Sequence, residues 1–306
     1  MEKSFRMELA GRPLIVETGK MAKQASGAVL VRYGETVVLV TSTASKEARE
    51  GMDFFPLTVD YEEKMYAVGK IPGGFIKREG RPSNAAILCA RLIDRPIRPL
   101  FPKGFRNDIQ VIATVLSVEQ DNPPDIAAMI GASCALSVSD IPFNGPIAGV
   151  RVGRVDGKFI INPTVEQREK SDLNLTIAGS YDAVMMVEAG ANELPEILES
   201  ILFGHKEIKR IVEFQRKIID ACGKKKREVR LFQTPPEMEQ AIRDYAAARL
   251  DAAVRDSDKL RRDEHIAAVN ADTMEHFLEI YPGAAKEIAA VLHDVEKDIV
   301  RRMITH

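Results

Sequence analysis

The stretch PPDIAAMIGASCALSVSD, residues 123–140, decides how this chain folds. Its two prolines suit the first turn of a helix, where the N–H group that proline lacks would have no partner. The residues that follow are mostly small or apolar, so they leave room for close packing. We therefore expect a tightly packed, largely buried helix.

Strands joined by tight turns are predicted on both sides of this helix. Alternating and β-branched runs predict hairpins that turn near Gly11, at Tyr33-Gly34-Glu35 and at Asp156-Gly157. The same patterns predict further strands in residues 55–63, 108–119, 172–180 and 183–191.

Helix ends are predicted from capping and breaking residues. Ser83 is placed to cap a helix over residues 84–94, and Pro96 should stop it because proline disfavours helical geometry at the residue before it. A long helical pattern covers residues from about 193 to 222, with a break expected at Gly204 and a stop at Gly223.

The chain changes character near residue 230. From Glu237 onward it carries alanine, leucine and charged residues at helical spacing, interrupted only at Tyr281-Pro282-Gly283. We expect a first domain over 1–230, a linker over 231–236 and an all-helical domain over 237–306, with the chain cut at a domain edge. The basic run Lys224 to Arg227 is interpreted as a solvated face or as charge at a helix C-terminus.

Composition excludes several classes of function. The chain is 45% hydrophobic and 29% charged, with no apolar run long enough for a membrane helix and no signal peptide, so we expect a cytoplasmic protein without a membrane partner. Cys89, Cys134 and Cys222 fit no metal pattern and are expected to be free thiols. All five histidines follow residue 204, which excludes histidine-based catalysis or metal binding from residues 1–204.

Positive charge is concentrated in one segment of an otherwise acidic chain. Residues 70–106 contain nine Lys or Arg and two acids, a net charge of +7, whereas the whole chain carries −2. Such a concentration indicates one basic surface that faces a polyanion.

The loop PGGFIKREGRPS, residues 72–83, lies within this segment. Its glycines allow phosphates to approach, its cations neutralise them, and Phe75 offers a face on which a base can stack, which suits single-stranded nucleic acid. A solvated charged loop with Phe75 in the core is the alternative. Arg91, Arg95 and Arg98 follow at helical spacing, and the single carboxylate of Asp94 can pair with Arg91 or Arg98 but cannot neutralise three guanidinium groups.

Several long segments together resemble the bacterial polynucleotide phosphorylase family. They include VETGKMAKQASGAVLVRYGETVVLVT (16–41), DFFPLTVDYEEKMYAVGKIPGGFIKREGRPS (53–83) and ARLIDRPIRPLFPKGF (90–105), in the family's order. The resemblance implies an α+β fold, with a first ribonuclease PH-like core of mixed sheets and packed helices followed by a small all-α domain. The whole family enzyme continues with a second core, a KH domain and an OB-type domain.

The resemblance also implies a function for the whole enzyme. The family forms a ring-shaped homotrimer that degrades messenger RNA from the 3′ end by phosphorolysis and releases nucleoside diphosphates. It uses Mg²⁺ and inorganic phosphate, and other RNA-degradation proteins are expected partners. No cofactor is expected in the 306 residues present.

The family's working site belongs to the second core, so the resemblance implies that this part holds RNA without cutting it. The positions that match the metal-binding acids and the lysine fall near Arg168, Asn174 and Thr176, and none of these replaces the original group. We therefore expect no catalytic or metal-binding residue here, although Asp172 lies nearby. A fragment with its own phosphorolytic activity and a purely structural assembly module remain alternatives.

The resemblance assigns the loop to the neck of the family's RNA channel. The family has two aromatic residues followed by two arginines where this chain has Phe75, Ile76, Lys77 and Arg78, so one stacking face and one bidentate guanidinium remain. Arg81 and the group Arg91, Arg95 and Arg98 also match positions near that channel. These eight residues are the predicted RNA-binding set.

Overall fold

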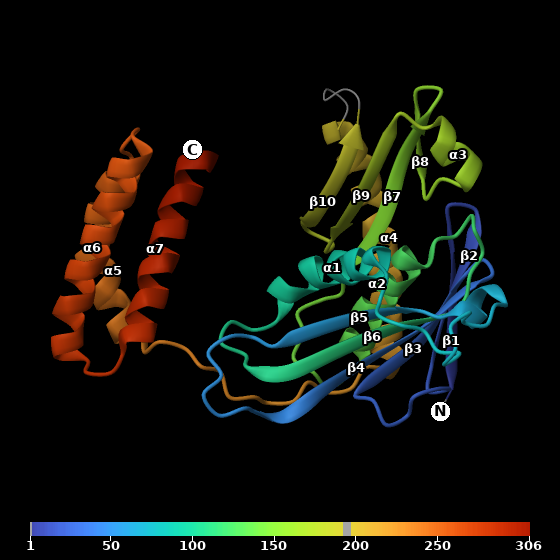
Figure 1. The fold of residues 1–306 in the computed structure, drawn as a ribbon, viewed down its shortest axis with the longest axis horizontal. Helices are drawn as coiled ribbons and strands as arrows, with labels where there is room; N and C mark the ends of the chain where they lie inside the picture. Colours follow the sequence, from blue (N-terminus) through green and yellow to red (C-terminus); the bar gives the residue numbers. More distant parts are fainter. Residues whose placement is uncertain (1, 192–196) are drawn as a thin grey trace. The chain divides into compact units, whose positions relative to one another are not determined.

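The computed structural model describes residues 2–191 and 197–306, which form two compact units, Met1–Leu231 and Phe232–His306. Each unit has its own hydrophobic core. Figure 1 labels the elements of both units.

The first unit contains a six-stranded and a four-stranded sheet. The larger sheet has the order β1-β2-β3-β4-β6-β5, and all its neighbours are antiparallel except the parallel pair β5 and β6. The smaller sheet is antiparallel, with the order β10-β9-β7-β8. The strands are β1 (Lys3–Leu9), β2 (Arg12–Thr18), β3 (Gly27–Tyr33), β4 (Thr36–Ala48), β5 (Leu57–Glu63), β6 (Asn107–Ser117), β7 (Ala148–Val155), β8 (Lys158–Ile161), β9 (Leu173–Gly179) and β10 (Val184–Ala191).

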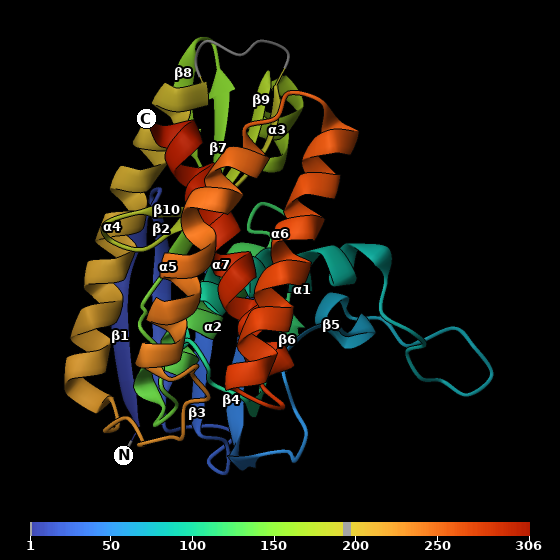
Figure 2. The ribbon, with the colours of Figure 1, turned by 90° about the vertical axis from the view of Figure 1, so that its left-hand side faces the viewer.

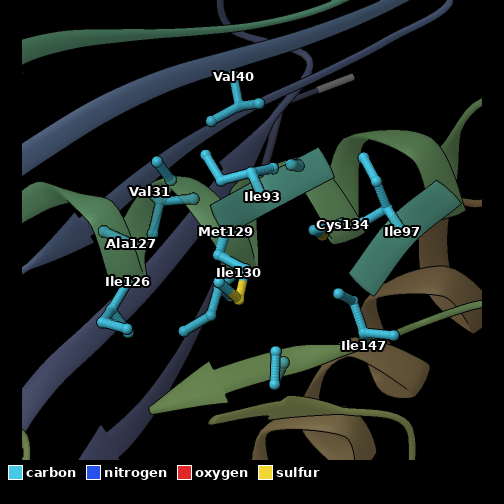
Figure 3. Packing of buried hydrophobic residues seen from close by; sticks show 14 of the residues in the cluster. Val31, Val40, Ile93, Ile97, Ile126, Ala127, Met129, Ile130, Cys134 and Ile147 are labelled. Carbon is cyan, nitrogen blue, oxygen red and sulfur yellow. The ribbon is translucent and has the colours of Figure 1, made fainter. Parts of the chain in front are cut away.

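The predicted buried helix is confirmed as α2 (Pro124–Val138), in which every residue from Asp125 to Val138 is buried. It packs against β3 and β4 of the larger sheet and against β7 of the smaller one (Figure 1). Small residues permit this approach, since a Cβ on Gly131 would lie 2.5 Å from Cγ2 of Val40. Figure 3 shows Val31 and Val40 of the larger sheet packed near Met129 and Ile130 of α2.

The three predicted hairpin turns are confirmed. The strands break at Ala10-Gly11, at Gly34-Glu35 and at Asp156-Gly157, and all three turn glycines adopt a positive φ. Ser83 caps α1 (Asn84–Ile97) as predicted, because its hydroxyl accepts a hydrogen bond of 3.0 Å from the Ala86 N–H.

Two predicted helix interruptions are wrong. Helix α1 continues through Pro96, whose ring is buried in the last turn, and ends at Ile97 before the short 3₁₀ helix η2 (Arg98–Leu100). Helix α4 (Ile197–Cys222) runs unbroken through Gly204, where a Cβ would lie 2.5 Å from Ile177 Cδ1. Gly204 therefore serves close packing on the smaller sheet rather than a break.

Helix α4 ends immediately before Gly223, as predicted, and the start predicted at residue 193 lies outside the described residues. The short helices η1 (Met65–Val68) and α3 (Val165–Lys170) complete the first unit. The second unit consists of α5 (Pro236–Val254), α6 (Lys259–Ile280) and α7 (Ala285–Thr305), with the connection at Tyr281-Pro282-Gly283 between α6 and α7.

The basic run after α4 closes the end of the buried helix. The Lys226 ammonium donates to the carbonyls of Leu136, Ser137 and Ser139 at 2.9, 2.9 and 2.8 Å. Arg227 forms a two-pronged ion pair with Asp140. The alternative of charge at a helix C-terminus is therefore confirmed for Lys226, but the helix is α2, which lies far upstream in the sequence.

This arrangement predicts that Lys226→Met destabilises the first unit. The change leaves carbonyls at the end of α2 without their donor, so the free energy of unfolding should fall by about 2 kcal/mol. Urea unfolding followed by circular dichroism measures this. Lys225→Met is the matched control, because Lys225 is exposed next to Lys226, and equal stability of the two variants would contradict the assigned role.

Candidate nucleic-acid interface

The segment between β5 and α1 carries the predicted loop. Figure 2 shows it extending away from the larger sheet as an open projection. Phe75 is fully exposed, and 70% of Ile76 is exposed. The alternative in which Phe75 fills the core is therefore wrong, and the loop presents its apolar side chains to solvent.

The base of the loop is fixed by two hydrogen bonds to neighbouring segments. The Glu79 carboxylate accepts from the Met65 N–H at 3.1 Å, and the Ser83 hydroxyl donates to Glu63 at 3.0 Å. The backbone N–H groups of Glu79 itself and of Met65 lower the pKa of Glu79. Nearer the tip, Lys77 has a φ of +50° and donates its N–H to the Gly74 carbonyl at 3.1 Å. The base is anchored while the tip stays open.

The loop's cations are exposed and uncompensated. No side-chain hydrogen bond or ion pair within the described part of the chain involves Lys77, Arg78 or Arg81, and all three are exposed. Their charge is thus available to an external anion. The nearby carboxylate of Glu79 is instead engaged by backbone N–H groups.

The arginines of α1 divide into two roles. Arg91 and Arg95 are exposed on the outer face of the helix. Arg98 grips Asp94 with two hydrogen bonds of 3.0 and 2.7 Å and also donates to the carbonyls of Phe55 and Leu57. Asp94 therefore pairs with Arg98 rather than Arg91, and Arg98 holds α1 to the segment that leads into β5.

The positions that match the family's catalytic groups lie together elsewhere in the first unit. Arg168 of α3, together with Asn174 and Thr176 of β9, lines a cleft of about 490 Å³. Asn174 and Thr176 point to the same side of β9 because they are two residues apart. The structure thus brings these three residues together, although the side chains carry no carboxylate.

The N-terminus of α2 opens into this cleft and is already neutralised. Asp125 is buried, accepts from the Ile126 N–H at 2.8 Å and forms an ion pair with Arg151. A helix N-terminus attracts anions, and here a carboxylate of the chain itself occupies that position. A phosphate at this point would have to displace or face Asp125.

Cys89, which lines the cleft, and Asp172, which lies beside it in the sequence, are the other candidates for chemistry. Asp172 is engaged by Arg154 at 2.8 Å, and that hydrogen bond lowers the pKa of Asp172. Burial raises the pKa of the Cys89 thiol to about 12, with a further contribution from Asp125, so the thiolate is scarce at neutral pH. Among residues 2–191 and 197–306, no group of three His, Cys, Asp or Glu side chains is arranged to hold a metal ion.

Sequence reasoning missed the Asp125–Arg151 pair and the position of Glu188, which also lines the cleft from β10. Asp125 follows two prolines in a first helical turn, which is a usable signal for a residue at a helix N-terminus. Nothing in the local sequence indicates that Arg151 or Glu188 would line the same cleft as Asp125, because that depends on how the two sheets pack.

No helix in the described ranges is long and apolar enough to cross a membrane.

Family models match most of the chain. The model described as "3′ exoribonuclease family, domain 1" matches residues 10–142, and its domain 2 matches residues 145–207. The model "Polyribonucleotide nucleotidyltransferase, RNA binding domain" matches residues 237–306.

Curated relatives carry the same name. A polyribonucleotide nucleotidyltransferase of Heliobacterium modesticaldum is 66% identical over 98% of this chain, and one of Brevibacillus brevis is 60% identical over 100% of it. The chain spans 43% and 44% of the length of these relatives.

A solved structure supports the fold alone. Rice Rrp46 superposes with a TM-score of 0.52 at 16% identity, covering 72% of this chain and 94% of that one. The ribonuclease PH-like core and the helical region predicted from the resemblance are confirmed.

Because Arg98 has partners within the chain and Arg95 is exposed, we expect their substitutions to affect the free energy of unfolding to different extents. Arg98→Gln should lower the free energy of unfolding by about 1 kcal/mol, since the side chain is partly exposed but loses its hold on Asp94 and two carbonyls. Arg95→Gln should change it by less than about 0.5 kcal/mol. Chemical denaturation measures both, and an equal loss of stability would contradict the assigned roles.

Proposed function

The chain belongs to the polyribonucleotide nucleotidyltransferase family, and we propose that it is the N-terminal, RNA-guiding and trimerising part of a phosphate-dependent 3′-to-5′ exoribonuclease. The whole enzyme would degrade messenger RNA in the cytoplasm, use inorganic phosphate and Mg²⁺, and release nucleoside diphosphates. This part would act as a homotrimer, alongside other RNA-degradation proteins.

The observation that carries the proposal is the exposed loop with its uncompensated cations. Phe75 offers an open stacking face, and Lys77, Arg78 and Arg81 lie within six residues of it. None of the three has an acidic side-chain partner in the described part of the chain. Stacking and phosphate neutralisation are the two interactions by which proteins hold single strands. Ile76 adds apolar contact but no aromatic face.

The proposed roles differ along the basic segment. The loop residues would contact bases and phosphates directly, and Arg91 and Arg95 would supply charge from the neighbouring helix. Arg98 would contribute mainly by fixing α1, because its donors already face Asp94, Phe55 and Leu57.

The cleft supports a non-catalytic role for this part. The residues that line it fit Mg²⁺ poorly, since Arg168 would repel a cation and Asn174 and Thr176 bring no charge. Of the two carboxylates that line it, Asp125 is paired with Arg151, which leaves Glu188 alone. The Asp125 carboxylate at the start of α2 disfavours a phosphate. The reaction would then take place in the rest of the whole enzyme.

A purely structural module that meets acidic proteins is the second candidate. Its basic surface would bind an acidic polypeptide as well as RNA. Binding of an acidic polypeptide, however, does not require a fully exposed aromatic ring beside the cations. The exposed Phe75 favours RNA.

We expect the triple variant Phe75→Ala/Lys77→Ala/Arg78→Ala to bind single-stranded RNA at least about tenfold more weakly, because it loses one stacking face and two phosphate contacts. The slope of log affinity against log salt should shrink by about 1.4. Filter binding of oligoadenylate to the 306-residue chain measures both quantities.

The control for this experiment is Phe54→Ala/Lys23→Ala/Lys225→Ala, which removes an exposed ring and two exposed cations outside the loop. It should retain most of the affinity. Equal affinities and equal salt slopes for the wild type and the loop variant would rule out the role assigned to the loop.

A further inference from the structure

The 3₁₀ helix η1, at the base of the loop, has no fully buried residue. It exposes Met65, Tyr66 and Val68, whereas Ala67 packs against the core. Tyr66 is 54% exposed, and its ring stacks on no other ring within the described part of the chain. Val68 and Ile71 are also exposed. A run of exposed apolar side chains next to a cationic loop marks an interaction surface.

Backbone contacts hold η1 in place. The Ala67 carbonyl accepts a hydrogen bond of 3.2 Å from the N–H of Val118, which lies just beyond β6. Gly69 ends the helix in the left-handed conformation and donates its N–H to the Tyr66 carbonyl. The Met65 N–H donates to Glu79 of the loop. Tyr66 is therefore carried on an element tied both to the larger sheet and to the base of the loop.

Tyr66 lies between two lysines in the sequence, Lys64 and Lys70. Lys70 follows η1, is exposed and has no side-chain hydrogen bond or ion pair in the ranges that the structure describes. Lys64, on the other side, is engaged by Glu62 at 3.0 Å. Along the chain, free cations and exposed rings thus alternate from Tyr66 through Lys70 and Phe75 to Lys77 and Arg78.

We propose that Tyr66 is a second stacking platform for single-stranded RNA, with Lys70 as the phosphate contact between it and the loop tip. The proposal rests on the function proposed above for the loop. It supplies from η1 the second aromatic face that Ile76 does not provide. The RNA strand would run from Phe75 at the tip toward η1 at the edge of the larger sheet.

Single-stranded RNA fits this surface better than an apolar protein partner. A protein interface built on Tyr66, Val68 and Ile71 would bury Lys70 without a compensating charge, which is costly. A polyphosphate strand places negative charge beside each base and so satisfies both the ring and the ammonium.

The test uses a short oligouridylate that contains 5-bromouridine, bound to the 306-residue chain. Tyr66→Leu should weaken binding about tenfold, because it keeps apolar bulk but removes the stacking face, and the salt slope should stay unchanged. Tyr66→Phe should bind like the wild type. Lys70→Gln should reduce the salt slope by about 0.7.

Photo-crosslinking followed by mass spectrometry gives a second readout. Crosslinks should map to Tyr66 and to Phe75. Phe54→Leu is the control, because Phe54 is 62% exposed but is separated from η1 by the whole of β5. It should leave affinity and crosslinks unchanged.

The outcomes separate the two proposals. If the triple loop variant weakens binding but Tyr66→Leu does not, or if Tyr66→Phe is as weak as Tyr66→Leu, the second platform is wrong and the loop's role stands. If the loop variant binds like the wild type, the proposed function fails. Displacement of the oligouridylate from the Tyr66 region by an acidic polypeptide, without a crosslink at Tyr66, would also overturn the inference.

Discussion

The packing of α2 between two sheets is the constraint on which the first unit depends. A helix with no polar face must be covered on all sides, and small residues such as Gly131 let the strands of the larger sheet approach it. Its two ends then need polar partners. Asp125 and Arg151 close the N-terminus, and Lys226 closes the C-terminus. The same helix therefore determines where the cleft opens and where the chain leaves the unit.

The cleft at the N-terminus of α2 and the exposed loop differ in how many of their charged groups are paired within the chain. At the cleft, Asp125 is already paired with Arg151, and Arg168, Asn174 and Thr176 bring no carboxylate for a metal ion. In the loop between η1 and α1, Phe75 is fully exposed, and Lys77, Arg78 and Arg81 have no side-chain partner among the residues that the structure describes. In the function that we propose, one fold thus separates a surface that holds a polyanion from a cleft that carries out no chemistry.

Much of the fold was predictable because it follows from local patterns. The turns at Gly11, Gly34 and Gly157 and the cap at Ser83 each depend on a few neighbouring residues. The errors at Pro96 and Gly204 arose where tertiary packing overrides local preference, since one residue is buried in the last turn and the other lies against the smaller sheet. Likewise, the sequence showed the cations of the loop, but which arginine would pair with Asp94, and what would face Asp125, depended on contacts between distant elements.

The central claim is that this part of the protein holds RNA without cutting it. The most direct measurement incubates the 306-residue chain with labelled polyadenylate, inorganic phosphate and Mg²⁺, and separates the products by chromatography. Our account predicts RNA binding with no release of adenosine diphosphate above the protein-free background. Release of adenosine diphosphate that disappears in Asp172→Asn would contradict it, because this part of the protein would then possess a working acid.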